Sequence, residues 1–202
     1  MFVQVINGRT SDPAGLRAAL DRWMQDLAPG ADGWLGSTEG VTSDGRFIAV
    51  VRFESEEQAR RNSDRPEQGQ WWSQTATLFD SEPEFHDSIW VVPDIVGDPA
   101  QAGFVQVMQG RSTDPDRARE LFDQDSEELR AFRPDILGSL AVAHEGNLWT
   151  MAIWFTSEAE AREGEKKEPT PEVAAQMAEM NKISDGVPEF FDLPEPWMYA
   201  PA

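Results

Sequence analysis

The chain has 202 residues, 37 of them acidic and 17 basic, which gives a formal charge of −20. Binding to nucleic acids or to anionic membrane surfaces needs Lys and Arg side chains, so we predict neither nucleic acid nor membrane as a partner. The absence of cysteine excludes disulfides, thiolate nucleophiles and cysteine metal sites. No secretory leader and no apolar segment of membrane-spanning length is recognisable, and we therefore expect a cytoplasmic protein.

The first two elements are predicted from side-chain type and spacing. Residues 2–8 are rich in β-forming side chains and predict a strand. The segment 11–30 predicts a helix, because Ser11 or Asp12 can cap its start. Pro13 fits the first helical turn. An apolar stripe at helical spacing supports this prediction: Leu16, Leu20, Trp23 and Leu27.

A hairpin and a second helix follow. Residues 34–41 and 46–54 predict two strands around an Asp-Gly turn, which is a strong hairpin signal. A helix capped by Ser55 is interrupted by the stretch 62–69 and then resumes. Residues 85–95 predict the last strand. The order β-α-β-β-α-β is that of the ferredoxin-like unit.

The same unit is encoded twice. Four stretches return in the same order: 2–13 at 104–115, 35–37 at 137–139, 52–60 at 154–162, and 83–87 at 188–192. A copy of this length is too long for a solenoid repeat, so each copy is a whole domain. We predict two domains, 1–98 and 99–202, joined through the Pro- and Gly-containing stretch 92–103.

The third strand of each copy is apolar at both alternation phases. The sequences Phe-Ile-Ala-Val-Val-Arg-Phe and Trp-Thr-Met-Ala-Ile-Trp-Phe leave no polar face on these strands. Helices cover only one face of a ferredoxin-like sheet, and the other face needs a partner. We therefore predict an α+β fold in which two ferredoxin-like repeats pack sheet to sheet as an intramolecular barrel, in a chain that is a monomer or a homodimer.

The element order, Asn7 on the first strand and the stretch 59–72, which ends in two tryptophans, resemble one family. It is the dimeric α/β-barrel superfamily, and more narrowly its antibiotic-biosynthesis-monooxygenase-like branch. The resemblance implies two barrel subunits fused in tandem, with a ligand pocket between the helices and the sheet of a unit. Some members of this branch are cofactor-free oxygenases of aromatic polyketides. Others degrade haem through an Asn, a Trp and a His.

The resemblance implies a site in the first copy. Asn7 and His86 are its catalytic candidates, the first to orient substrate or oxygen and the second as acid, base or hydrogen-bond donor. The substrate-binding candidates are tryptophans: Trp71, Trp72, Trp34 and Trp23. We predict no metal and no cofactor. Haem stays an open alternative, although His86 is predicted at the start of a strand and not on a helix.

The second copy changes each member of this set. Gln109 aligns with Asn7 and Asp125 with Trp23, and these two are the candidates of the second repeat. Asp125 is either a general base of raised pKa in an apolar pocket or a side chain that faces water. Phe191 aligns with His86, which equally fits His86 as an ordinary packed residue.

Three further residues carry expectations. Arg9 and Arg111 stand at equivalent places after the first strand of each copy, which predicts a shared structural role. His144 falls in the predicted second hairpin turn, where we expect it to be exposed. The sequence thus leaves two functions open: a monooxygenase-like protein that binds a planar, mostly apolar molecule in repeat 1, or a non-catalytic ligand-binding or structural barrel.

Overall fold

The computed structural model describes residues 1–95, 97–124 and 127–201. Asp125 lies outside the described residues. By their contacts the residues divide into two compact units, one of Met1–Ser88 with Pro196–Ala202 and one of Ile89–Glu195. Each unit combines an antiparallel sheet with helices, so the predicted α+β class is confirmed.

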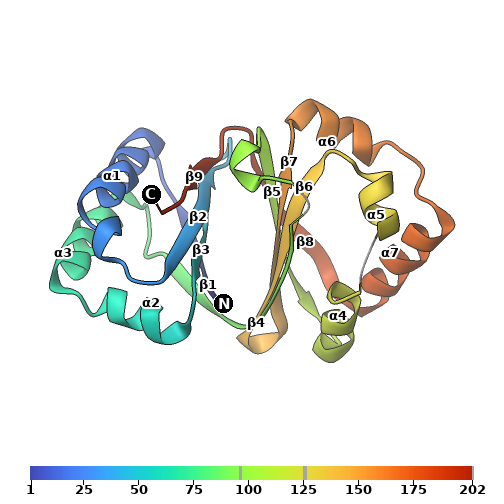
Figure 1. Cartoon of the computed structure of the whole chain (residues 1–202), viewed down its shortest axis with the longest axis horizontal. Helices are drawn as coiled ribbons and strands as arrows, with labels where there is room; N and C mark the ends of the chain where they lie inside the picture. Colours follow the sequence, from blue (N-terminus) through green and yellow to red (C-terminus); the bar gives the residue numbers. More distant parts are fainter. Residues whose placement is uncertain (96, 125–126, 202) are drawn as a thin grey trace. The chain divides into compact units, whose positions relative to one another are not determined.

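The first unit has a five-stranded sheet with helices on one face (Figure 1). Its elements are β1 (Phe2–Arg9), α1 (Pro13–Asp26), β2 (Trp34–Val41), β3 (Arg46–Phe53), α2 (Glu56–Ser63), α3 (Pro66–Thr75), the start of β4 (Glu84–Ile95) and β9 (Trp197–Tyr199). The strand order is β4-β1-β3-β2-β9. The first unit thus takes its outermost strand from the far end of the chain.

The second unit repeats this plan. Its elements are β5 (Phe104–Ser112), α4 (Pro115–Phe122), α5 (Glu127–Phe132), β6 (Ile136–His144), β7 (Leu148–Phe155), α6 (Glu158–Glu165), α7 (Pro171–Ile183) and β8 (Ser184–Leu193). The strand order is β8-β5-β7-β6, with β4 beside β6. Short 3₁₀ turns are Ala28–Gly30, Ala76–Leu78, Pro99–Gln101 and Glu145–Asn147.

The helix caps follow the sequence signals in both copies. The Asp12 carboxylate accepts a hydrogen bond from the Gly15 backbone N–H at the start of α1, and Asp114 does the same at the start of α4. Ser55 caps α2 and Ser157 caps α6. Such caps satisfy backbone donors that lack a partner within the helix. The predicted break in the second helix is the α2–α3 junction.

The repeated Leu-Gly-Ser motif marks a close approach of two strands. At Gly36 on β2 the φ angle is +118°, and a Cβ would lie 2.6 Å from the carbonyl oxygen of Tyr199 on β9. At Gly138 on β6 a Cβ would lie 3.0 Å from the carbonyl oxygen of Asp94 on β4. Glycine permits both contacts because it has no side chain. The motif is therefore architectural in each unit.

The repeated Gly-Arg pair is architectural as well. Arg9 Nη1 donates a hydrogen bond to the Asp44 carbonyl oxygen at 2.6 Å, and Arg111 Nη1 donates to the Gly146 carbonyl oxygen at the same distance. Each arginine thus ties its first strand to the turn of the neighbouring hairpin. This agrees with the shared structural role predicted for Arg9 and Arg111.

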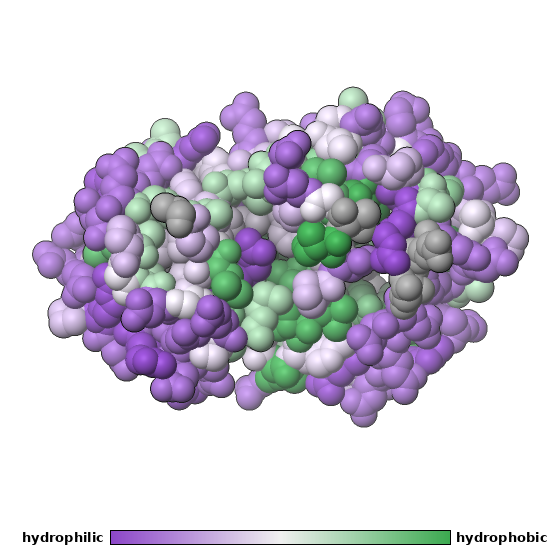
Figure 2. Space-filling model, viewed as in Figure 1, coloured by the Kyte–Doolittle hydropathy of each residue, from purple (hydrophilic) through white to green (hydrophobic). Residues whose placement is uncertain are grey.

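Hydrophilic side chains cover the outward faces of the helices of each unit (Figure 2). This agrees with the large excess of acidic residues in the chain. Within the described ranges, no helix is long and apolar enough to cross a membrane.

Candidate functional site

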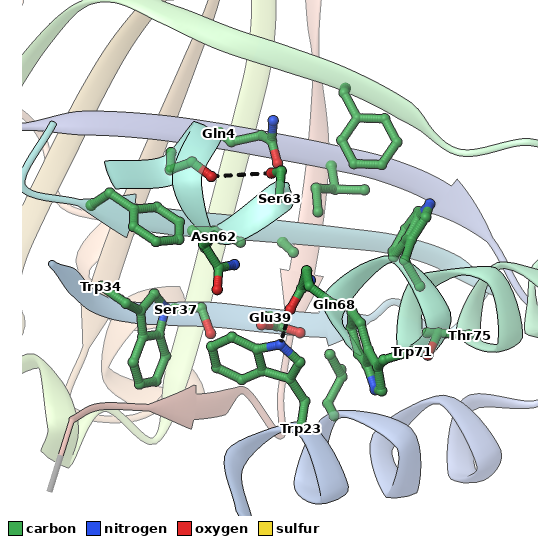
Figure 3. Close-up of a pocket in the computed structure, with 18 of the residues that line it drawn as sticks. Gln4, Trp23, Trp34, Ser37, Glu39, Asn62, Ser63, Gln68, Trp71 and Thr75 are labelled. Carbon is green, nitrogen blue, oxygen red and sulfur yellow. Dashed lines mark hydrogen bonds between the residues drawn. The ribbon is translucent and has the colours of Figure 1, made fainter. Parts of the chain in front are cut away.

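The first unit contains a cavity of about 300 Å³ between its helices and the sheet (Figure 3). Its floor is formed by the helix-facing side chains of β1, β2 and β3, and its walls come from α1, α2 and α3. Most of the lining is aromatic or aliphatic. A cavity of this kind holds small, largely apolar ligands.

The four predicted tryptophans lie together in this lining. Their rings form a continuous chain of contacts. The centroids of Trp23 and Trp34 are 5.0 Å apart, those of Trp23 and Trp71 6.3 Å, and those of Trp71 and Trp72 6.0 Å. Trp72 also meets Phe85 edge to face at 5.2 Å. The result is an aromatic wall that offers flat surfaces to a planar molecule.

The indole N–H groups of this wall differ in their partners. Trp23 Nε1 donates to Gln68 Oε1 at 2.7 Å, a bond drawn in Figure 3. Trp71 Nε1 donates to the Ala19 carbonyl oxygen at 3.1 Å. Trp34 Nε1 is buried and has no hydrogen-bond partner among the residues that the structure describes. A buried donor without an acceptor is costly, which makes Trp34 Nε1 a candidate for a ligand contact.

A β-bulge brings Trp34 onto the same face as Ser37 and Glu39. Strand residues alternate between faces, so Trp34 and Ser37 would ordinarily point to opposite sides. The register of β2 against β3 shifts between Trp34 and Gly36. The extra residue resets the alternation, and all three side chains line the cavity.

Glu39 is the carboxylate in this lining (Figure 3). Only 5% of the residue is exposed, and within the described part of the chain its Oε2 atom has no hydrogen-bond partner. Burial raises the pKa of Glu39 to about 7, and a hydrogen bond with the Ser37 side chain opposes this shift. A carboxyl group with a pKa near neutrality can both accept and return a proton at physiological pH.

Glu39 was not among the residues predicted from the sequence. Comparison of the two copies could have pointed to Glu39. Ala141 stands at the equivalent position of the second copy and is itself buried. The fold therefore accepts a small apolar residue at a position where the first copy buries a carboxylate. Buried acidic residues without a counter-charge are rare and cluster at functional sites.

Asn7 and His86 lie on the other face of the sheet. Asn7 pairs with Ile48 on β3, whereas Gln4 and Ile6 of the same strand line the cavity. His86 pairs with Val5, so it shares the face of Asn7. We expected Asn7 and His86 to line one cavity together with the tryptophans. This expectation is corrected, because strand alternation places both side chains on the face of the sheet opposite the cavity.

The cavity does not fit haem, which was the alternative ligand that the family resemblance implied. Among the described residues that line it there is no His, Cys, Tyr or Met to serve as an axial ligand. His86 faces away from the cavity, and its Nε2 lies 3.7 Å from the Glu84 carboxylate.

The second copy carries a different polar group on the face away from its helices. Gln109 Nε2 donates to Thr150 Oγ1 at 3.0 Å, and His144 Nε2 lies 2.9 Å from the same hydroxyl. His144 is 3% exposed, so the expectation of an exposed turn residue was wrong. It ends β6 and points into this hydrogen-bonded group instead of toward water.

The fold and the cavity together define an α+β protein with a mostly apolar cavity in its first ferredoxin-like unit. No family model and no curated protein matches the sequence. Solved structures do match over nearly the whole chain, and these matches show the α+β, ferredoxin-like fold.

Three of these structures illustrate the similarity. One is a "putative monooxygenase" from Lactobacillus acidophilus, with a TM-score of 0.75, 12% identity and coverage of 98% of this chain and 96% of that one. A second is an anthrone oxidase-like protein, with a TM-score of 0.69, 11% identity and coverage of 98% and 92%. The third is a ferredoxin-fold protein from Listeria monocytogenes related to antibiotic biosynthesis monooxygenases, with a TM-score of 0.52, 12% identity and coverage of 100% and 95%.

Proposed function

We propose that the cavity of the first unit binds a planar, mostly apolar small molecule and that Glu39 exchanges a proton with it. The observation that carries this proposal is the pair of buried polar atoms without partners, Glu39 Oε2 and Trp34 Nε1, in one aromatic cavity. A ligand with a carbonyl oxygen for Trp34 and an acidic proton for Glu39 satisfies both. The remaining surface of such a ligand is covered by aromatic rings.

The reaction that suits this set is a cofactor-independent monooxygenation of an activated ring CH₂ group. Glu39 takes one proton from the CH₂ carbon, and the resulting enolate is stabilised by the Trp34 N–H. The carbanion carbon transfers its electrons to dioxygen and binds it, and the proton returned from Glu39 completes a hydroperoxide. Loss of the second proton from carbon and cleavage of the O–O bond then give a carbonyl group and water. The sum is R–CH₂–R′ + O₂ → R–C(=O)–R′ + H₂O.

Two observations support this reaction over plain storage of a ligand. The pKa of Glu39 lies near 7, where a general base works best at neutral pH. The anthrone oxidase-like structure suggests a substrate type, because anthrone has a ring CH₂ conjugated with a carbonyl group.

The test is dioxygen uptake with anthrone as the probe, followed by absorbance of the anthraquinone product. We expect one dioxygen consumed per anthrone. Glu39→Gln is expected to lower the rate by about 10²-fold or more, because removal of a general base typically costs that much. The matched control is Glu82→Gln, an exposed glutamate outside the cavity. Anthrone that quenches tryptophan fluorescence without dioxygen uptake above the buffer rate would identify a binding protein and refute the enzyme.

The same assay tests the residues predicted from the sequence. Roles for Asn7 and His86 in catalysis predict large losses in Asn7→Ala and His86→Ala. The cavity geometry predicts rates within about twofold of the wild type for folded variants of both, because strand alternation places these side chains on the sheet face opposite the cavity.

We also propose that the two units close an intramolecular barrel, sheet against sheet. The support is that buried apolar side chains lie on the face away from the helices in both copies, with Ile48 and Val50 on β3 and Ala152 and Trp154 on β7. Small-angle X-ray scattering of the full chain tests this. A radius of gyration near 16–17 Å, as about 200 residues in one compact body give, is expected. A clearly larger value with a two-lobed distance distribution would contradict it.

A further inference from the structure

The end of the chain lies against the strand that carries Glu39. In β9, Trp197 pairs with Glu39, Met198 with Thr38 and Tyr199 with Ser37. Strand β9 is the outermost strand beyond β2 in the first unit. Without β9, β2 would be an edge strand whose backbone is open to water on one side.

Two side chains of β9 close the space between β2 and α1. Trp197 is 7% exposed and packs against Phe47, with ring centroids 6.4 Å apart. Tyr199 donates a hydrogen bond from its hydroxyl to Asp21 Oδ1 on α1 at 2.8 Å. Residues directly paired in an antiparallel sheet share a face. Trp197 and Tyr199 therefore lie on the helix side of the sheet, next to Glu39 and Ser37.

The backbone of β2 is shaped to receive this strand. Gly36 leaves room for the Tyr199 carbonyl oxygen, which a Cβ would meet at 2.6 Å. The same glycine belongs to the bulge that turns Trp34 toward the cavity. The bulge in β2 therefore turns Trp34 toward the cavity and also makes room for the backbone of β9.

We propose that Trp197 and Tyr199 are positioning residues of the candidate site, which hold Glu39 in a dry environment and so set its readiness to accept a proton. The role of these residues in catalysis rests on the proposed function. Their effect on the protonation of Glu39 does not depend on turnover and can be measured without it. The pieces of chain at 34–39 and 197–199 are far apart in sequence, and the site is complete only when both are in place.

The electrostatics of this corner agree with the proposal. Burial, the hydrogen bond with Asp21 and the negative charges of Glu39 and Asp21 raise the pKa of Tyr199, so its hydroxyl stays neutral and adds no charge beside Glu39. Arg17 on α1 lies over the Trp197 ring at 5.8 Å. The facing residues from β3 and α2, Ala49 and Asn62, carry no titratable group. Exclusion of water is thus the main influence on Glu39, as its pKa indicates.

The test measures protonation of Glu39 directly in the full chain, by infrared titration of its carboxyl C=O band, assigned through Glu39→Gln. In the wild type the midpoint is expected at about 7. Trp197→Ala removes the cover, and the midpoint is expected to fall by about one unit or more as water reaches the carboxylate. The matched control is Trp90→Ala, a half-buried tryptophan of the second unit, which is expected to leave the midpoint unchanged.

Tyr199→Phe keeps the test decisive if Trp197→Ala does not fold. It removes only the hydroxyl that joins β9 to α1, so faster hydrogen exchange of residues 197–199 and a lower midpoint are expected together. An unchanged midpoint in a folded Trp197→Ala variant, or in Tyr199→Phe with faster exchange, would overturn the proposal. Absence of anthrone oxidation would refute the proposed function alone, because the infrared midpoint does not depend on turnover.

Discussion

Replacement of Glu39 by Gln is predicted to make the protein more stable at alkaline pH and not at acidic pH. In the folded protein burial raises the pKa of Glu39 from 4.5 to about 7. Below pH 4.5 the carboxyl group is protonated in both the folded and the unfolded state and contributes no difference. Between pH 4.5 and 7 the folded state holds the proton more tightly, so its stability falls as the pH rises through this window.

The size of the effect follows from the shift. Each unit of pKa corresponds to about 1.4 kcal/mol, so the ionised Glu39 costs the folded state about 3 kcal/mol above pH 7. Glu39→Gln removes this cost and keeps the shape of the side chain. Its advantage in unfolding free energy over the wild type should therefore grow by about 3 kcal/mol between pH 4 and pH 8.

The assay is urea unfolding at both pH values, with Glu82→Gln as the exposed control. All other groups titrate alike in wild type and variant, so they cancel in the difference. An advantage of Glu39→Gln that is the same at pH 4 and pH 8 would refute the raised pKa and with it the assignment of Glu39 as a proton acceptor.

Three further predictions concern single contacts. Trp34→Phe should weaken anthraquinone binding by about tenfold, because it removes a buried N–H that has no partner among the described residues, and the smaller ring should also lower the stability of the core; equal binding by the folded variant in a fluorescence titration would contradict this. Asp135→Ala should lower the unfolding free energy by about 3 kcal/mol, because it breaks the buried ion pair with Arg133 at 2.7 Å, and a loss below about 1 kcal/mol in urea unfolding would count against it. Arg9→Met and Arg111→Met should each cost about 1 kcal/mol, and a cost in only one of them would deny their shared role.

Local signals in the sequence predicted most of the fold. Asp12 and Ser55 cap the helices as expected, and the Asp-Gly turn joins β2 to β3. The stretches that return in the second half of the sequence predicted the second unit. What local signals did not contain was the exchange of end strands, in which β9 joins the first unit. The pairing of strands far apart in sequence produces no periodic pattern of side chains. Gly36 and Gly138 are the sequence features that mark where β9 and β4 approach their neighbouring strands.

The site was half predictable for a similar reason. Aromatic side chains on predicted helices led to Trp23, Trp71 and Trp72, which do line the cavity. Asn7 was expected there through the resemblance, but strand alternation turns it to the other face. Glu39 was missed because a glutamate in a polar-looking strand gives no sign of burial until the bulge at Gly36 and the cover by β9 are known.

The most direct test of the central claim is the pH dependence of dioxygen uptake with anthrone. The wild type is predicted to rise with pH to half its maximal rate near pH 7, the pKa of Glu39, and Glu39→Gln is predicted to show neither the rate nor the rise. A rate that is independent of pH between 5 and 9, or one that Glu39→Gln retains in full, would contradict the account.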